Sequence, residues 1–237
     1  MTGSGDAAPS GSEERVRAGL TEVRERVAAA CAGAQRDTSR VRLIAVSKRH
    51  PPEALRVAYA MGQREFGENY VQELVAKGRA LSDLPHLQLR LIGHLQRNKV
   101  KELLRLGPAL RSVDTLDSVR LAETLGREAE AANRRLEVLV QVNPAGEQQK
   151  SGVAEFELPV LIAAVRAIPA LDLRGLMLIP PNVDPEARRP FFRRLRELAQ
   201  ELGLLELSMG MSDDLEPAIA EGATQVRVGT AIFGERG

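Results

Sequence analysis

The sequence predicts a single (β/α)8 barrel, and three observations predict it. Eight short apolar runs typical of strands alternate with segments of helical periodicity. The chain has 237 residues, close to the size of roughly 250 residues that such barrels commonly have. The early strand runs are apolar on both faces, as a parallel sheet covered by helices requires. A doubly wound sheet is the competing fold, but eight evenly spaced strands favour a closed barrel.

The N-terminal part of the chain divides into a tail and a helix. Residues 1–12 are rich in Gly, Ser and Ala and offer little apolar surface to bury, so we expect a disordered tail. From Ser12 onward, apolar residues recur at helical spacing. These residues are Val16, Leu20, Val23, Val27 and Cys31. We therefore expect Cys31 in the core, and residues 13–237 as the barrel.

The remaining elements alternate along the chain. Strands are expected at 42–48, 64–69, 88–93, 110–114, 137–143, 173–179, 206–210 and 225–230. Helices are expected at 52–61, 70–81, 96–105, 117–133, 155–167, 186–202 and 214–221. In barrels of this kind the chemistry takes place at the carboxyl ends of the strands. The residues that follow each strand are therefore the candidates for a functional site.

Composition excludes several classes of function. Lys and Arg total 33 against 32 Asp and Glu, so no strong overall field attracts nucleic acid or an anionic membrane. Aromatic residues make up 3% of the chain and Trp is absent, which argues against a platform for stacking bases. No membrane span or secretory signal is recognisable, and the single cysteine excludes an internal disulfide. We expect a soluble cytoplasmic protein.

Lys48 ends the first expected strand of the barrel. Alternation places Ile44, Val46 and Lys48 on the side that points into the barrel. Desolvation disfavours the charged form of a lysine, and the neutral amine is the nucleophile that condenses with an aldehyde to form a Schiff base. The alternative is a lysine that extends from the strand end to water. Lys48 taken alone favours that alternative.

Arg227 lies within the last expected strand and changes this balance. Val226 and Val228 face one side, so Arg227 and Gly229 face the other, toward the inside of the barrel. A buried guanidinium needs an acceptor. That acceptor is a structural carboxylate, a heteroaromatic nitrogen or a phosphate.

Small and polar residues follow the strands at 206–210 and 225–230. Ser208, Gly210 and Ser212 lead into a helix, and Gly229 and Thr230 end the last strand. Barrels often hold a phosphate between the loops after strands 7 and 8, where small residues let backbone N–H groups approach an anion. Such a turn is also a common connector, so the phosphate hypothesis depends on its combination with Thr230 and Arg227.

The neighbouring charges and polar residues have simpler interpretations. Asp213 and Asp214 oppose an anion, so we expect them to cap the following helix with their side chains turned away from a ligand. Asn69 either orients a ligand ring or caps the helix expected at 70–81, and capping is favoured. The arginines of the 186–202 helix are expected on a solvated face. The three histidines lack metal-ligand spacing, so we predict no metal site.

Seven segments together resemble one known family. They are AVSK at 45–48, FGENYVQE at 66–73, IGHLQRNK at 92–99, KSG at 150–152, RGLM at 174–177, LSMGMSDD at 207–214 and VRVGTAIFGER at 226–236. In this order and spacing they are similar to the pyridoxal phosphate homeostasis proteins. The resemblance runs from about Val41 to Arg236, nearly the whole chain beyond the tail.

The resemblance implies a fold like the N-terminal barrel of alanine racemase and a cofactor, pyridoxal 5′-phosphate (PLP). It implies that Lys48 carries PLP as a Schiff base and that Arg227 faces the pyridine nitrogen. Asn69 would lie beside the ring. Ser208, Gly210, Ser212, Gly229 and Thr230 would be expected around the phosphate.

Two functions from different classes remain open. One is a non-catalytic PLP carrier that takes part in homeostasis of free PLP and passes it to apo-enzymes. The other is a racemase-like PLP enzyme with Lys48 as one of its bases. The chain ends seven residues after Thr230, so we expect neither the C-terminal β-domain of alanine racemases nor its second acid/base tyrosine. This expectation favours the carrier over the racemase-like enzyme. It also favours a monomer, because the domain that brings racemases together is not expected. A phosphosugar enzyme that uses Lys48 directly is a third, weaker alternative.

Overall fold

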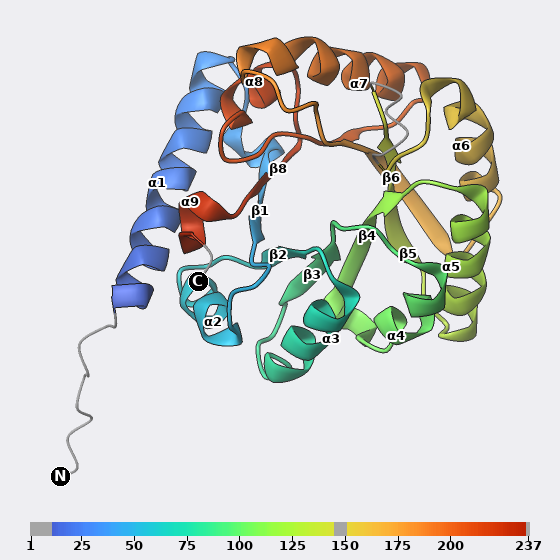
Figure 1. The fold of residues 1–237 in the computed structure, drawn as a ribbon, viewed down its shortest axis with the longest axis horizontal. Helices are drawn as coiled ribbons and strands as arrows, with labels where there is room; N and C mark the ends of the chain where they lie inside the picture. The colour runs from blue at the N-terminus through green and yellow to red at the C-terminus, as the bar shows by residue number, and fades with distance from the viewer. Residues whose placement is uncertain (1–10, 145–150, 236–237) are drawn as a thin grey trace.

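The computed structural model describes residues 11–144 and 151–235, and within them eight strands form one closed barrel (Figure 1). All neighbouring strands are parallel, and β1 pairs with β8 to close the barrel. The strands are β1 (Arg42–Val46), β2 (Glu65–Glu68), β3 (Gln88–Leu91), β4 (Leu110–Leu116), β5 (Leu136–Val142), β6 (Leu171–Leu178), β7 (Glu206–Ser208) and β8 (Gln225–Val228). The predicted barrel is confirmed.

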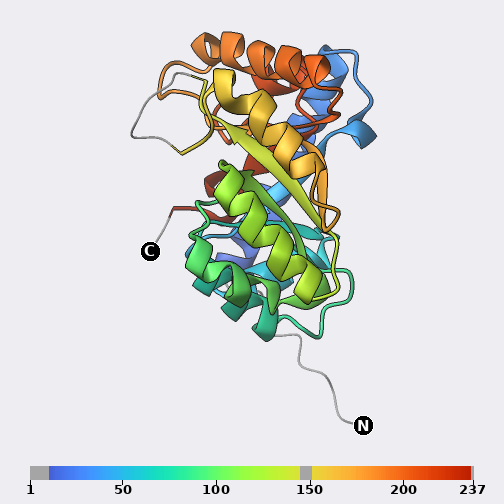
Figure 2. The ribbon, with the colours of Figure 1, turned by 90° about the vertical axis from the view of Figure 1, so that its right-hand side faces the viewer.

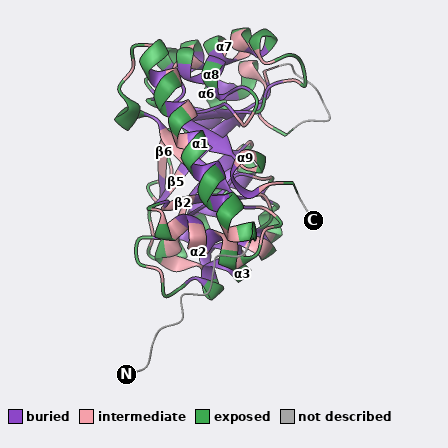
Figure 3. Cartoon of the chain, turned by 90° about the vertical axis from the view of Figure 1, so that its left-hand side faces the viewer, coloured by how far each residue is buried: buried purple, intermediate pink, exposed green. Residues whose placement is uncertain are grey.

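Helices follow the strands and cover the outside of the barrel. They are α1 (Gly11–Gly33), α2 (Pro52–Ala60), α3 (Val71–Ala80), α4 (Val100–Leu104), α5 (Val119–Ala131), α6 (Leu158–Arg166), α7 (Arg189–Glu201), α8 (Leu215–Ala220) and α9 (Thr230–Phe233). Figure 2 shows α5 and α6 in front of the strands and α7 along the top, and Figure 3 shows buried strands within a shell of helices whose outer faces are exposed. Gly11 and Ser12 belong to α1, while residues 1–10 of the expected tail lie outside the described residues.

The long helix α1 fills a gap in the ring of outer helices. The helix after β8 is the single-turn α9, which the sequence patterns did not predict and which is too short to cover β8 and β1. Helix α1 packs instead against α8, α9 and α2. A Cβ added to Gly19 of α1 would lie 2.3 Å from the carbonyl oxygen of Ala231 in α9, so only glycine allows this approach. The N-terminal helix therefore supports the segment that carries Thr230.

Two separate apolar regions hold the barrel together. The outer faces of the strands, such as Phe66, Val226 and Val228, join the inner faces of the helices in one large core that also includes Cys31. Among the residues that the structure describes, five buried apolar ones lie outside that core, and alternation along their strands places them inside the barrel. They are Ile44, Val46, Ile92, Leu139 and Met177.

The inside of the barrel is also charged, which the expectation of strands apolar on both faces did not include. Arg42 pairs with Glu206 at 2.6 Å, and the fully buried Arg90 pairs with Glu65 at 2.6 Å. Burial raises the pKa of Asp114, while the guanidinium of Arg90 opposes this shift. In a narrow barrel, inward side chains from all strands share a small volume, so charges of opposite sign can satisfy one another.

The arginines of helix α7 lie on a partly exposed face, as expected, but Arg188 does not. Arg188, just before the helix, is buried and pairs with Asp214 at 2.7 Å. Glu221 accepts contacts from three arginines of the helix, of which Arg193 is the nearest at 2.8 Å. The prediction was wrong for Arg188, because helical periodicity cannot show that acidic residues of the next βα unit face these arginines.

The Glu221 cluster predicts a pH-dependent contribution to stability. The hydrogen bond from Arg193 lowers the pKa of Glu221, so the cluster stabilises the fold above the ordinary glutamate pKa of about 4.3. This contribution is lost as the pH falls through the lowered pKa. Glu221→Gln should reduce the free energy of unfolding by roughly 2 kcal/mol at neutral pH. Urea unfolding between pH 7 and pH 3 checks this, and a difference that did not shrink on acidification would contradict it.

Of the helices in the described part of the chain, none combines the length and the apolar character that crossing a bilayer requires.

Candidate functional site

A pocket of about 390 Å³ opens at the carboxyl ends of the strands, where the barrel fold predicts a site. It brings together residues from the loops after β1, β2, β7 and β8. The lining residues are Val46, Lys48, His50, Asn69, Ile92, Ile179, Met211, Ser212, Asp213, Arg227, Gly229, Thr230 and Gly234. Six of the eight residues predicted for the site are among them, namely Lys48, Asn69, Ser212, Arg227, Gly229 and Thr230.

Lys48 lines this pocket from a turn and not from the strand itself. Strand β1 ends at Val46, and the backbone N–H of His50 donates to the carbonyl oxygen of Ser47 at 3.0 Å, which closes the turn. The predicted alternation still holds, because Ile44 and Val46 lie inside the barrel while Ser47 is buried on the outer side. The pocket therefore contains a lysine side chain that is half-buried.

Arg227 reaches the same pocket from the inner face of β8. Its guanidinium donates to Ser208 Oγ at 2.8 Å and to the carbonyl oxygen of Leu178 at 2.9 Å. Its backbone N–H donates to the carbonyl oxygen of Gly210 at 2.9 Å. These bonds hold the cation at the pocket, where it offers charge and hydrogen-bond donors to a ligand.

Burial lowers the pKa of Arg227, but not far enough to deprotonate the side chain at neutral pH. Desolvation lowers the pKa of Arg227 to about 10, while the negative charges of Asp114 and Asp214 oppose the shift. At neutral pH the side chain therefore stays a cation. The pocket presents one fixed positive charge to a ligand at its inner end.

Ser208 and Gly210 do not line the pocket. Ser208 is buried behind Arg227 and accepts its hydrogen bond. Gly210 has a φ of 92°, and a Cβ there would lie 2.6 Å from the Cβ of Ala218, so both the conformation and the space call for glycine. These two predicted residues shape the loop and orient the arginine.

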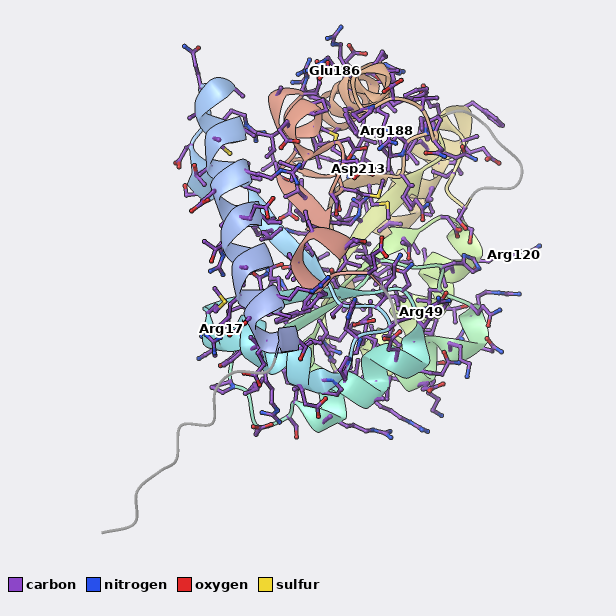
Figure 4. The ribbon with its side chains drawn as sticks, turned by 60° about the vertical axis from the view of Figure 1, so that its left-hand side comes forward. Arg17, Arg49, Arg120, Glu186, Arg188 and Asp213 are labelled. Carbon is purple, nitrogen blue, oxygen red and sulfur yellow. The ribbon has the colours of Figure 1, made fainter. Side chains whose placement is uncertain are left out.

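The two neighbouring aspartates have different surroundings. Asp214 is fully buried, where it accepts the backbone N–H of Met211 at 2.5 Å and pairs with Arg188, and its side chain makes no cap hydrogen bond. Asp213 is exposed and lines the pocket, contrary to the expectation that it turns away. In Figure 4, Asp213 and Arg188 lie in the upper half of the view, and Arg49, next to Lys48, lies in the lower half.

Asn69 does not cap helix α3. The N-cap residue is Tyr70, and the helix begins at Val71 without a side-chain cap. Asn69 lines the main pocket and an adjoining cavity of about 260 Å³. A Cβ added to Gly93 would lie 2.1 Å from the carbonyl oxygen of Asn69, so this glycine allows the loops after β2 and β3 to pack closely. The interpretation as a cap was wrong.

The adjoining cavity extends the site toward β3 and β5. It shares Ile92 and Ile179 with the main pocket and also contains His94 and Asn143. Within residues 11–144 and 151–235, no group of three or more His, Cys, Asp and Glu residues is placed to hold a metal ion.

Seven lining residues were not among the predicted site residues. Val46, His50, Met211 and Asp213 each lie one or two positions from a predicted one, so nearness in sequence was the available signal. Ile92, Ile179 and Gly234 carried no such signal. The ring of His50 stacks on that of Phe233 at 5.1 Å, a contact between chain segments that no local pattern predicts.

Comparisons with known proteins match this chain over most of its length. Residues 20–237 match the family described as alanine racemase, N-terminal domain. The pyridoxal phosphate homeostasis protein of Pseudomonas aeruginosa is 47% identical over 220 residues, which cover 92% of this chain and 94% of the relative. The protein of the same name from Escherichia coli K12 is 41% identical over 227 residues, which cover 92% of this chain and 95% of that protein.

Solved structures agree with the fold. PipY of Synechococcus elongatus, in a structure with PLP bound, is 39% identical, with a TM-score of 0.76 over 94% of this chain and 100% of that one. An alanine racemase of Clostridium difficile is 12% identical, with a TM-score of 0.70 over 94% of this chain and 57% of that one, and so supports the fold alone. With the sequence relatives, these likenesses show that the chain belongs to the pyridoxal phosphate homeostasis protein family, built on the alanine racemase N-terminal domain.

Proposed function

We propose that this protein binds PLP in the main pocket, holds it covalently on Lys48 and takes part in the homeostasis of free PLP. The observation that carries the proposal is the convergence of Lys48, Arg227 and the small polar residues Ser212 and Thr230 on one pocket. The pocket of about 390 Å³ is large enough for a single phosphorylated pyridine ring. The donors present fit the chemistry of that ligand.

Each residue has a distinct role in this proposal. The Lys48 amine adds to the aldehyde carbon, so that a C=N bond replaces C=O and one water leaves. Ser212, Gly229 and Thr230 lie at the rim, where hydroxyl and backbone N–H groups can donate to phosphate oxygens. Asn69 and Arg227 line the same pocket, where Asn69 would lie beside the ring and Arg227 would donate to the pyridine nitrogen.

Arg227 limits the chemistry that the site supports. When bound, PLP supplies an electron sink for carbanion chemistry. A cation that donates to the pyridine nitrogen disfavours protonation of that nitrogen and so weakens the sink. Since Arg227 stays protonated at neutral pH, the site suits holding the cofactor better than transamination.

The arrangement of titratable groups favours a carrier over a racemase. Racemisation with two bases needs acid/base groups on opposite faces of the substrate carbon. Besides Lys48 and Arg227, the titratable residues that line the main pocket are His50, which belongs to the same turn as Lys48, and the exposed Asp213. We therefore propose a non-catalytic role in which the protein limits free PLP and passes it to apo-enzymes in the cytoplasm.

The test begins with the visible absorption spectrum of protein incubated with PLP, before and after borohydride reduction, followed by mass mapping of the adduct. A reducible adduct on Lys48 without turnover across a panel of amino acids is the expected result. Turnover would identify an enzyme, and the absence of an adduct on Lys48 would contradict the cofactor site.

Thr230→Ala should weaken PLP binding, because it removes one hydroxyl donor to the phosphate. A hydrogen bond to a charged group contributes roughly 1.5–3 kcal/mol, which corresponds to about a 10- to 100-fold loss of affinity. Equilibrium dialysis checks this, with Thr21→Ala as the control because Thr21 lies on an exposed part of α1. Unchanged affinity in Thr230→Ala would remove Thr230 from the phosphate site.

A further inference from the structure

We infer that Lys77, Glu68 and Glu73 form a positioning cluster behind the pocket that sets the geometry of the Lys48 turn and thereby the reactivity of the Lys48 amine. The inference rests on the proposed function, since it concerns the rate at which Lys48 reacts with an aldehyde. None of the three residues lines the main pocket. Their effect therefore passes through the backbone.

Lys77 of α3 is the centre of this cluster. Its Nζ donates to the carbonyl oxygen of Ser47 at 2.6 Å, to Glu68 Oε1 at 2.6 Å and to Glu73 Oε1 at 2.7 Å. An ammonium group has three N–H donors, so all of them are used. The lysine thereby ties helix α3 to the ends of β1 and β2.

The cluster holds both residues that flank Lys48. Ser47 accepts from Lys77 through its carbonyl oxygen and donates through Oγ to Glu68 Oε1 at 2.6 Å. On the other side of Lys48, the backbone N–H of Arg49 donates to Glu73 Oε1. The turn that carries Lys48 is therefore fixed before and after this residue.

Arg49 shows why the turn needs such support. Its φ is 64°, in the left-handed region that residues with a side chain rarely adopt. The hydrogen bond to Glu73 and the neighbouring bonds of Lys77 hold the turn in this conformation. Without them, the 47–50 turn would be free to relax, and the Lys48 amine would move with it.

Because the cluster is buried, we expect it to fix the position of the Lys48 turn more than to stabilise the fold. The Lys77 side chain is 4% exposed and that of Glu68 is fully buried, so these charges lose their hydration. Desolvation raises the pKa of Glu68, although the nearby ammonium of Lys77 opposes the shift. Buried ion pairs often stabilise a fold no better than apolar residues of similar size. Glu68 also precedes Asn69, so the same cluster supports a second lining residue.

The experiment compares Glu73→Ala with Glu73→Gln. Glu73 is the more exposed carboxylate of the cluster, so its removal should leave the fold intact. We expect Glu73→Ala to slow formation of the borohydride-reducible adduct about tenfold, because small misplacement of a reacting group has effects of this order. Its affinity for pyridoxine 5′-phosphate, which lacks the aldehyde, should stay the same. Glu73→Gln keeps an oxygen acceptor and should restore most of the rate.

Glu221→Ala is the matched control, because it removes a carboxylate from a cluster of arginines at the opposite end of the barrel. It should lower the melting temperature without changing the rate of adduct formation. An unchanged rate in Glu73→Ala would overturn the inference, as would equal losses of rate and of affinity for the analogue. If the unaltered protein forms no adduct on Lys48, the proposed function fails first, and this inference fails with it.

Discussion

Lys48→Ala is expected to abolish the borohydride-reducible PLP adduct entirely. The chain has five lysines, and Lys48 is the one that lines the pocket with Arg227 and Thr230 among the described residues. The variant should keep weaker binding through the phosphate and the ring, because Ser212, Thr230 and Arg227 remain. Mass mapping after reduction measures the loss of the adduct, and dialysis measures the remaining affinity.

Lys101→Ala is the control for this experiment, since Lys101 lies exposed on α4, away from the pocket. It should retain the full adduct. If Lys48→Ala still formed a reducible adduct at the original stoichiometry, another amine would be the attachment point and the proposed role of Lys48 would be wrong.

Arg227→Gln is expected to have the second-largest effect, on both cofactor binding and stability. Ser208 Oγ and the Leu178 carbonyl oxygen lose the guanidinium that donates to them, and Asp114 loses a nearby cation. Leaving buried acceptors unsatisfied costs about 1–3 kcal/mol each. PLP affinity should fall by roughly 10- to 100-fold if the arginine donates to the ring. Thermal unfolding and dialysis measure the two effects.

Arg42→Gln is the control for Arg227→Gln. It shows whether a loss of PLP affinity comes from removing any cation inside the barrel or only from removing the one at the pocket. Arg42 also lies inside the barrel and pairs with Glu206, but at the opposite end of the strands. It should reduce stability while leaving PLP affinity unchanged. If Arg227→Gln bound PLP as tightly as Arg42→Gln, the contact between Arg227 and the ring would be refuted.

Local patterns predicted much of the fold, and most of the residues predicted for the site line the pocket. Alternation with a period of two placed Ile44, Val46 and Arg227 inside the barrel, and the structure confirms this. The barrel rule, in which chemistry lies at the carboxyl ends of the strands, then directed attention to the loops that line the main pocket. Ser208 and Gly210 were expected around the phosphate but do not line the main pocket, and Ser208 accepts a hydrogen bond from Arg227.

The errors share one cause. Arg188 was expected on a solvated face but pairs with Asp214 from the next βα unit, and Asn69 was interpreted as a cap but lies between two cavities. In each case a side chain with a plausible local role is placed by a partner far along the chain. Helical or strand periodicity carries no information about such partners.

The order of strands and helices, the parallel barrel that follows from it, and the end of the barrel where Lys48 and Arg227 would meet could all be predicted from the amino-acid pattern. The packing of α1 into the ring of helices, the pairing of charges inside the barrel, and the contacts of Lys77 and Glu73 with the turn around Lys48 became visible in the folded chain. The physical reason is that periodicity specifies which side of an element faces the core. The partner that each buried charge meets depends on how distant elements pack against one another.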